Sequence, residues 1–153
     1  MTREAAKGAS VAIRAMRESD VEAVHRLAEQ LGYPTQPALT LARIRTVLAS
    51  DVADAFVAED SEGCVLGWAL VFTAPFLESG PKAELGGLVV EESSRGRGIG
   101  TALVSRTESW ARERGLRELC LRSNVIRTEA HAFYQRLGFA IQKSQFKFQK
   151  EIE

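Results

Sequence analysis

Three glycines alternate with larger residues in one short stretch of the chain, Arg95-Gly96-Arg97-Gly98-Ile99-Gly100. The stretch lies between a predicted strand and a predicted helix, so backbone N–H groups can converge on an anion at the helix N-terminus. Arg95 and Arg97 add positive charge, which suits a pyrophosphate better than a lone carboxylate. The alternative is a turn whose glycines only let the strand and the helix pack closely. The interleaved arginines and the strand-to-helix context favour the phosphate site.

Other kinds of phosphate-binding loop fit this stretch less well. A Walker loop requires Gly-Lys-Ser or Gly-Lys-Thr after four spacer residues, and the sequence does not contain it. A dinucleotide-binding fingerprint would require glycine at position 101, where the chain has Thr101. The preceding strand also comes too late in the chain for a domain that begins with its nucleotide site. Both types of loop are therefore minor alternatives.

Hydrophobic periodicity predicts the elements that must position the loop. The predicted strands cover residues 11–16, 55–58, 65–72, 83–90, 116–121, 139–142 and 146–152. The predicted helices cover residues 19–31, 37–50, 99–114 and 128–137. Ser19 and Glu22 form a capping-box signature at the start of the first helix. The order is β-α-α-β-β-β-α-β-α-β-β, and the strand, helix and strand around the loop imply a right-handed crossover with a parallel pair of strands.

Length and composition indicate one globular domain. The chain has 153 residues, which we expect to form a single domain over residues 1–153 with residues 1–10 frayed. Its 20 basic and 20 acidic residues cancel, so we expect neither a nucleic acid nor a membrane as partner. The absence of a signal-like or membrane-spanning run predicts a cytoplasmic location. Cys64 and Cys120 have no metal-site spacing and are predicted to be core residues.

The loop resembles the Arg/Gln-x-x-Gly-x-Gly/Ala signature of the GCN5-related N-acetyltransferase family, and the upstream Leu88-Val89-Val90 is similar as well. The resemblance extends over nearly the whole chain through the order of its elements. It implies an α/β (α+β) fold with a mixed, mostly antiparallel central sheet flanked by helices. It also implies acetyl-CoA as a co-substrate, direct transfer of the acetyl group to an amine, and no metal.

The resemblance implies a set of cofactor-binding residues. The backbone of the strand before the loop would bond the pantetheine amides, and a bulge near Leu88 would direct one N–H at the thioester oxygen. The loop would hold the pyrophosphate, and Asn124 would bond the pantetheine arm. The implied residues are Leu88, Val89, Val90, Arg95, Gly96, Arg97, Gly98, Ile99, Gly100, Thr101 and Asn124.

Two side chains are implied to be catalytic. Tyr134, on the last helix, would protonate the leaving thiolate; its alternative role is that of a core tyrosine. Glu84, which precedes Arg95 by 11 residues, would accept the proton of the amine. An edge carboxylate that faces solvent is the alternative for Glu84, with water as the base. For His131 we expect a local packing or capping role.

The acceptor is not defined by these patterns. The sequence of residues 123–139 resembles that of small-amine branches of the family, such as aminoalkylphosphonate and aminoglycoside acetyltransferases. This resemblance favours a small-molecule amine as the acceptor. We expect acceptor contacts from residues 32–37 and 72–79, while Trp68 and Phe72 can be core or acceptor-pocket residues. A protein lysine or N-terminal acetyltransferase and a non-catalytic acetyl-CoA sensor remain alternatives, and a homodimer is left open.

Overall fold

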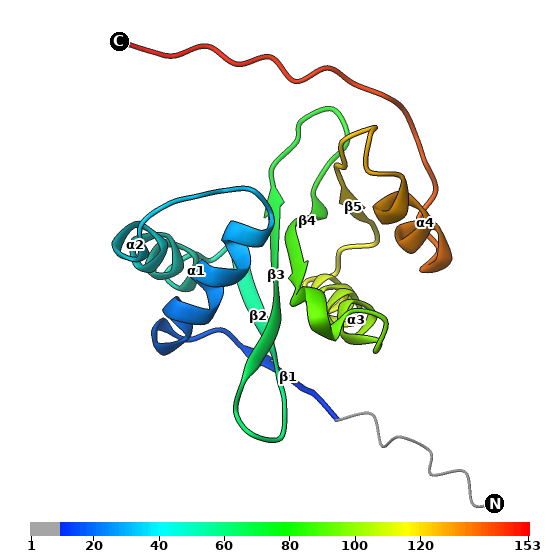
Figure 1. Cartoon of the computed structure of the whole chain (residues 1–153). Coiled ribbons are helices and arrows are strands. Elements are labelled where there is room, and N and C mark those ends of the chain that lie inside the picture. Colours follow the sequence, from blue (N-terminus) through cyan, green and yellow to red (C-terminus); the bar gives the residue numbers. More distant parts are fainter. Residues whose placement is uncertain (1–9) are drawn as a thin grey trace, which may run out of the picture. The chain divides into compact units, whose positions relative to one another are not determined.

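A computed structural model describes residues 10–153 of the chain (Figure 1). The strands are β1 (Ala12–Ala15), β2 (Ala53–Glu59), β3 (Val65–Ala74), β4 (Lys82–Val90) and β5 (Leu119–Leu121). The α-helices are α1 (Val21–Gln30), α2 (Pro37–Leu48), α3 (Ile99–Glu113) and α4 (Thr128–Arg136). Short 3-10 helices, η1 (Glu18–Asp20) and η2 (Glu92–Ser94), precede α1 and the glycine-rich loop. The predicted frayed start lies, except for Ser10, outside the described residues.

The five strands form one sheet in the order β1-β2-β3-β4-β5. The first four are antiparallel neighbours, and β5 is parallel to β4. This arrangement confirms the mixed, mostly antiparallel sheet and the parallel pair on either side of α3. After its C-terminal end at Val90, β4 continues through η2 into the glycine-rich loop.

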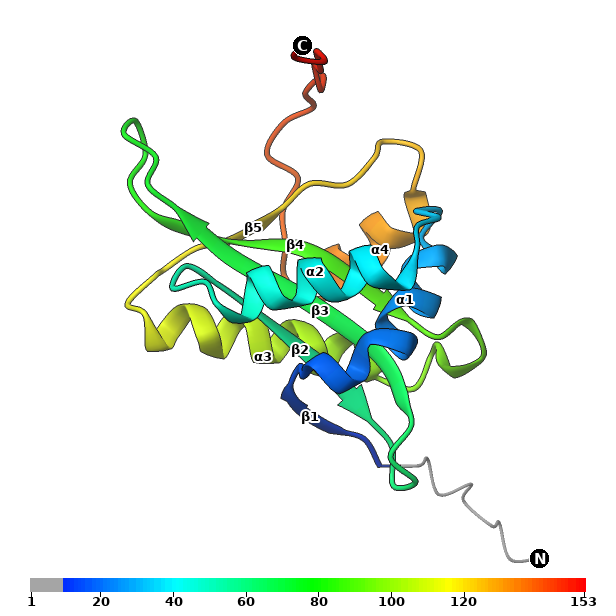
Figure 2. The same ribbon diagram turned by 90° about the vertical axis from the view of Figure 1, so that its left-hand side faces the viewer.

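Helices cover both faces of this sheet (Figure 2). On one face, α1 and α2 bury Val24, Leu27 and Ile44 against a cluster that includes Val57 and Val89. On the other face, α3 packs closely, since a Cβ built at Gly67 of β3 would lie 3.2 Å from Leu103 Cδ1. Trp110 of α3 is 1% exposed, as its place on the apolar stripe predicts.

The entry to α1 is fixed by a buried carboxylate and not by the predicted capping box of Ser19 and Glu22. Asp20 is buried and accepts a hydrogen bond from the backbone N–H of Arg17 at 2.8 Å. Its carboxylate also pairs with Arg14 at 2.8 Å, and Arg14 in turn contacts Glu59 at 2.7 Å. Burial alone would raise the pKa of Asp20, but the bonds from Arg14 and Arg17 hold it below its ordinary value. This network joins β1, β2 and the start of α1.

The described residues divide after Leu121 into two compact units, residues 10–121 and 122–153. The second unit contains α4 and an extended segment, residues 139–153, that forms no strand. The predicted strands over 139–142 and 146–152 are therefore absent from the structure. Phe146, Phe148 and Ile152 of this segment are at least 90% exposed. A strand requires a hydrogen-bonded neighbour, and alternation along one segment does not specify which neighbour that is.

Within residues 10–153, none of the helices is both long and apolar enough to cross a membrane.

Candidate functional site

The glycine-rich loop connects η2 to α3 and is held at both ends by buried side chains. Ser94 is 5% exposed and Ile99 is 2% exposed, whereas Arg95, Gly96, Arg97 and Gly98 between them are exposed. Gly96 and Gly98 adopt φ angles of 77° and 79°, a left-handed conformation that costs larger residues about 1–2 kcal/mol. These glycines turn the chain sharply, so the loop projects into solvent directly in front of α3.

The electrostatics of this loop favour an anion. Gly98 is the N-cap of α3 and provides no side-chain cap, so the N–H groups of the first helical turn have no partner within the helix. The helix dipole adds a partial positive charge at the same end. Arg95 and Arg97 flank the turn, and Arg95 Nε donates to the carbonyl oxygen of Val90 at 3.3 Å. The predicted residues 95–101 thus lie together around one helix N-terminus.

Beyond Leu85, β4 has only one hydrogen-bonded neighbour among the described strands. β4 pairs with β5 only over residues 83–85, because β5 ends at Leu121. On its other side, β4 stays paired with β3, so Leu88 lies opposite Ala69 and Val90 opposite Gly67. The N–H of Glu91 donates to the carbonyl oxygen of Leu66 at 2.7 Å, so the backbone groups of Glu91 and, by alternation, of Val89 face β3. The backbone groups of Leu88 and Val90 face the other edge and can bond an extended ligand as a further strand would.

A β-bulge interrupts β4 at Gly86, two residues before the predicted position near Leu88. Leu70 lies opposite Gly87 and Val71 opposite Leu85, so Gly86 is the extra residue. A Cβ at Gly86 would lie 2.9 Å from the ring of Phe72, and one at Gly87 would lie 2.9 Å from the ring of Trp68. A larger residue at either position would therefore displace one of these rings. The pair Gly86-Gly87 inside a predicted strand was the available signal for this feature.

Glu84 lies just before the bulge and is 8% exposed. It is opposite Phe72 of β3 and Cys120 of β5, so it belongs to an interior strand and not to the edge of the sheet. Residues that lie opposite each other in neighbouring strands point to the same face of the sheet, and so do residues two apart in one strand. Phe72 therefore points to the same face as Trp68 and Leu70, which pack against the core under α1 and α2, here called the α1/α2 face. The carboxylate is therefore buried on the α1/α2 face. This excludes the alternative of a solvent-facing edge carboxylate.

The second unit positions Asn124, His131 and Tyr134. Asn124 Oδ1 accepts a hydrogen bond from the N–H of Ile126 at 3.1 Å, so its Nδ2 is the group left to donate to a ligand. His131 Nε2 lies 2.9 Å from the carbonyl oxygen of Asn124, which confirms the local packing role expected for this histidine. The side chains of Asn124 and His131 therefore shape the turn that leads into α4.

Tyr134 lies on α4 between two aromatic rings. Its ring centroid is 5.1 Å from that of Phe133 and 5.7 Å from that of Phe139, both in edge-on geometry. Burial raises the pKa of the phenol above its ordinary value, and the charge of Arg127 offsets part of that rise. Tyr134 is therefore protonated at neutral pH and can donate a proton.

The structure thus brings together one part of the predicted site. The carboxylate of Glu84, the open edge at residues 88–90 and the loop at residues 95–101 follow one another along β4 and into α3. Asn124 and Tyr134 form a second group in their own unit. The approach of Tyr134 to the loop stays a prediction.

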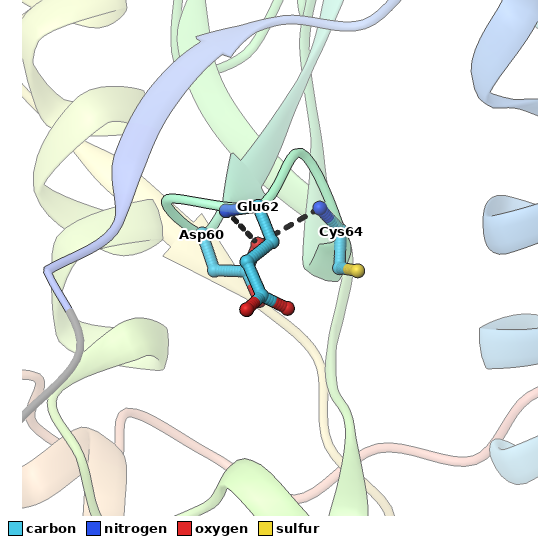
Figure 3. A group of neighbouring side chains, drawn as sticks. All are labelled: Asp60, Glu62 and Cys64. Carbon is cyan, nitrogen blue, oxygen red and sulfur yellow. Dashed lines mark hydrogen bonds between the residues drawn. The ribbon is translucent and has the colours of Figure 1, made fainter.

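The turn between β2 and β3 brings a second set of potential ligands together, away from the loop. Asp60, Glu62 and Cys64 place one ligand atom each within 4.8 Å of one another (Figure 3). Asp60 Oδ1 accepts hydrogen bonds from the N–H groups of Glu62 at 2.9 Å and Cys64 at 2.8 Å, which explains the cluster as a closed turn. Cys64 and Cys120 are both exposed, so their predicted core positions are wrong. Cys64 lies in the turn before β3, and Cys120 lies on β5 between Leu119 and Leu121, whose side chains point to the opposite face of that strand.

Comparison with known proteins agrees with this geometry. A family profile described as the acetyltransferase (GNAT) family matches residues 20–139. An aminoglycoside N(6')-acetyltransferase type 1 of Serratia marcescens is 29% identical over 103 residues, which are 65% of this chain and 70% of that enzyme. An aminoalkylphosphonate N-acetyltransferase of Salmonella typhimurium is 38% identical over 69 residues, which are 45% of this chain and 44% of that enzyme.

Solved structures show the same fold. The aminoglycoside N-acetyltransferase AAC(6')-Iy in complex with CoA superimposes with a TM-score of 0.86 at 24% identity, covering 96% of this chain and 99% of that one. A transcriptional regulator from Bacillus halodurans gives a TM-score of 0.82 at 24% identity, covering 92% and 100%. The family profile matches most of the chain, and the fold is shared with solved N-acetyltransferases. The glycine-rich loop at the start of α3 lies within the matched residues. The chain therefore belongs to the acetyltransferase (GNAT) family, an enzyme family of N-acetyltransferases.

Proposed function

We propose that this chain transfers the acetyl group of acetyl-CoA to a primary amine of a small molecule, by direct attack in a ternary complex. The observation that carries this proposal is the continuity of β4 with the loop. An open strand edge at residues 88–90 leads within a few residues to an exposed, arginine-flanked helix N-terminus. An extended ligand that ends in a pyrophosphate matches both features.

The cofactor-binding residues follow from this continuity. Backbone groups of Leu88 and Val90 bond the pantetheine amides, whereas those of Val89 face β3. The N–H groups around Gly96, Gly98 and Gly100 bind the pyrophosphate. Arg95, Arg97 and Thr101 add charge-assisted and hydroxyl contacts, and Asn124 Nδ2 donates to the pantetheine arm. The complex of the structurally similar AAC(6')-Iy with CoA supports acetyl-CoA as the co-substrate.

Acetyl transfer requires an amine without its proton. An alkylammonium has a pKa near 10.4, so deprotonation at neutral pH costs about 4–5 kcal/mol. Glu84 is the residue we assign as the base, acting directly or through one water, because its carboxylate is buried on β4 just before the bulge. The free amine then forms a bond to the thioester carbon.

Collapse of the resulting oxyanion breaks the carbon–sulfur bond. We assign the stabilisation of the oxyanion to a backbone N–H near Leu88, where β4 has an open edge, and protonation of the thiolate to Tyr134. The raised pKa of Tyr134 keeps its proton available at neutral pH. The proton lost by the amine and the proton gained by sulfur balance, and the products are an N-acetylated amine and CoA.

Amine-dependent release of free thiol from acetyl-CoA tests the reaction. We expect thiol release and an equal amount of acetylated amine for at least one primary amine in a chemically varied panel. Binding of acetyl-CoA without transfer to any amine would contradict the catalytic proposal and favour a sensor.

The pH profile of Glu84→Gln tests the base. This variant keeps the size of the side chain but cannot accept a proton, so kcat/KM should fall at neutral pH and approach the wild-type value near the pKa of the amine. A deficit that is equal at every pH would show instead that Glu84 holds a cationic acceptor by its charge. Wild-type activity throughout would leave water as the base.

A further inference from the structure

Two connections flank the part of β4 where the amine is activated. The β3–β4 connection, residues 75–81, leads directly into β4. The α1–α2 connection, residues 31–36, begins near the other end of β4, because Gln30 Nε2 donates to Glu91 Oε1 at 3.1 Å. Residues 84–88 lie between these two ends of the strand. The two connections therefore lie at opposite ends of β4, on either side of an acceptor bound beside Glu84.

Acidic residues are scarce in these two connections and in α2. No Asp or Glu occurs between residues 30 and 50, although the chain has 20 acidic residues among its 153. The same stretch contains Arg43 and Arg45, and Arg45 is paired with Glu18 at 3.1 Å. The β3–β4 connection contains one acidic residue, Glu78. Glu91, at the far end of β4, is paired with Arg26 at 3.4 Å. Two exposed carboxylates next to this region already have partners, since Glu29 pairs with His25 at 3.2 Å and Glu18 with Arg45 at 3.1 Å. Glu84 and Glu78 are the carboxylates that we assign to a cationic acceptor.

The exposed side chains of the two connections and of the start of α2 are apolar instead. In the α1–α2 connection, Tyr33 is 70% exposed, and at the start of α2, Leu39 is 53% exposed. In the β3–β4 connection, Leu77 is fully exposed. The ring of Phe72 adds an aromatic surface at the bulge, opposite Glu84. This region therefore combines apolar surface with few negative charges.

Charge complementarity then selects between two classes of amine. Each ammonium that leaves water needs a compensating carboxylate, and a polycationic substrate would leave several ammonium groups near a helix, α2, that contains no acidic residue. An apolar body gains about 25 cal/mol for each Å² that it buries, and a single ammonium is attracted by aromatic rings. We infer that the acceptor is a monocationic amine with an apolar body and not a polycationic aminoglycoside, the substrate class in the names of several similar proteins. This inference rests on the proposed function.

A comparison of two groups of acceptors tests the inference. We would measure kcat/KM with acetyl-CoA for tyramine and phenethylamine, and for kanamycin and tobramycin, from the release of free thiol. We expect values at least tenfold higher for the two monoamines. Equal or higher values for the aminoglycosides would overturn the inference and leave the proposed function intact. No thiol release with any of the four amines or a wider amine panel would contradict the proposed function, and the inference would fall with it.

Two matched variants test the charge argument itself. Leu39 is the third residue of α2, where an added carboxylate is compatible with the helix dipole, so Leu39→Glu should fold. Ser105→Glu adds the same charge at an exposed position of α3, on the other face of the sheet. We expect Leu39→Glu to raise kcat/KM for kanamycin at least threefold and Ser105→Glu to leave it unchanged. An equal change in kcat/KM for kanamycin in the two variants would contradict the proposal that the lack of acidic residues at the start of α2 disfavours polycationic acceptors.

Discussion

The two units of the chain differ in how their elements are stabilised. In residues 10–121, every strand pairs with a neighbour and α3 buries six residues, among them Ile99, Leu103 and Trp110. In residues 122–153, α4 contains no buried residue and the segment after it forms no strand. A helix makes its backbone hydrogen bonds within its own segment, whereas a strand depends on a partner that the local sequence does not specify. The candidate site draws Glu84 and the loop from the first unit, and Tyr134 and Asn124 from the second.

The largest effect should come from the core of the first unit. Leu103 is fully buried and lies close to Gly67 of β3. Leu103→Ala should lower the free energy of unfolding by about 3 kcal/mol through lost burial and the cavity left behind. Denaturant unfolding followed by circular dichroism measures this loss. A loss below about 1 kcal/mol would mean that α3 is not packed on the sheet as described.

The sequence predicted the first unit well for identifiable reasons. The glycines at 96 and 98, Pro37 at the start of α2 and Gly115 after α3 are local signals that act at the position where they occur. The pair Gly86-Gly87 signals an irregularity in β4, but the sequence does not show which residue is the extra one, because that depends on the register between β3 and β4 and on where the rings of Phe72 and Trp68 lie. Register is a property of two strands together.

The errors have the same origin. Cys64 and Cys120 were expected in the core because their neighbours in sequence are apolar, yet both are exposed. The burial of Glu84 follows from the position of β4 between two strands, which no local pattern contains. In the second unit, the alternating Phe146, Lys147 and Phe148 predict a strand, but the described residues provide no neighbour for it.

The second-largest effect should come from Tyr134 and concerns activity instead of stability. Tyr134→Phe removes only the hydroxyl, so turnover should fall by about 10²-fold while CoA affinity persists. Because the pKa of the phenol is raised, the proton is retained at neutral pH, and any loss of activity due to its ionisation should appear only above about pH 10. Steady-state kinetics across pH measure both effects. Wild-type turnover in Tyr134→Phe would show that the hydroxyl of Tyr134 does not protonate the thiolate.

The smallest effect should come from the extended segment. Phe148 is 92% exposed, so Phe148→Ala should change the free energy of unfolding by less than about 0.5 kcal/mol. Leu103→Ala, measured in parallel, provides the contrast. A loss of about 2 kcal/mol or more would show that residues 139–153 dock on a surface and that the predicted strands form there. A dependence of that loss on protein concentration would identify the surface as that of a second copy.

The central claim is that the loop before α3 binds the pyrophosphate of CoA, and titration calorimetry with CoA on three proteins tests it most directly. Gly98→Val and Gly115→Val place the same side chain at φ angles of 79° and 70°, at opposite ends of α3, so the backbone strain should be similar. We predict that the wild type binds CoA, that Gly98→Val raises Kd at least tenfold, and that Gly115→Val leaves Kd unchanged. The same Kd in all three folded proteins, or no binding of CoA to the wild type, would contradict the account.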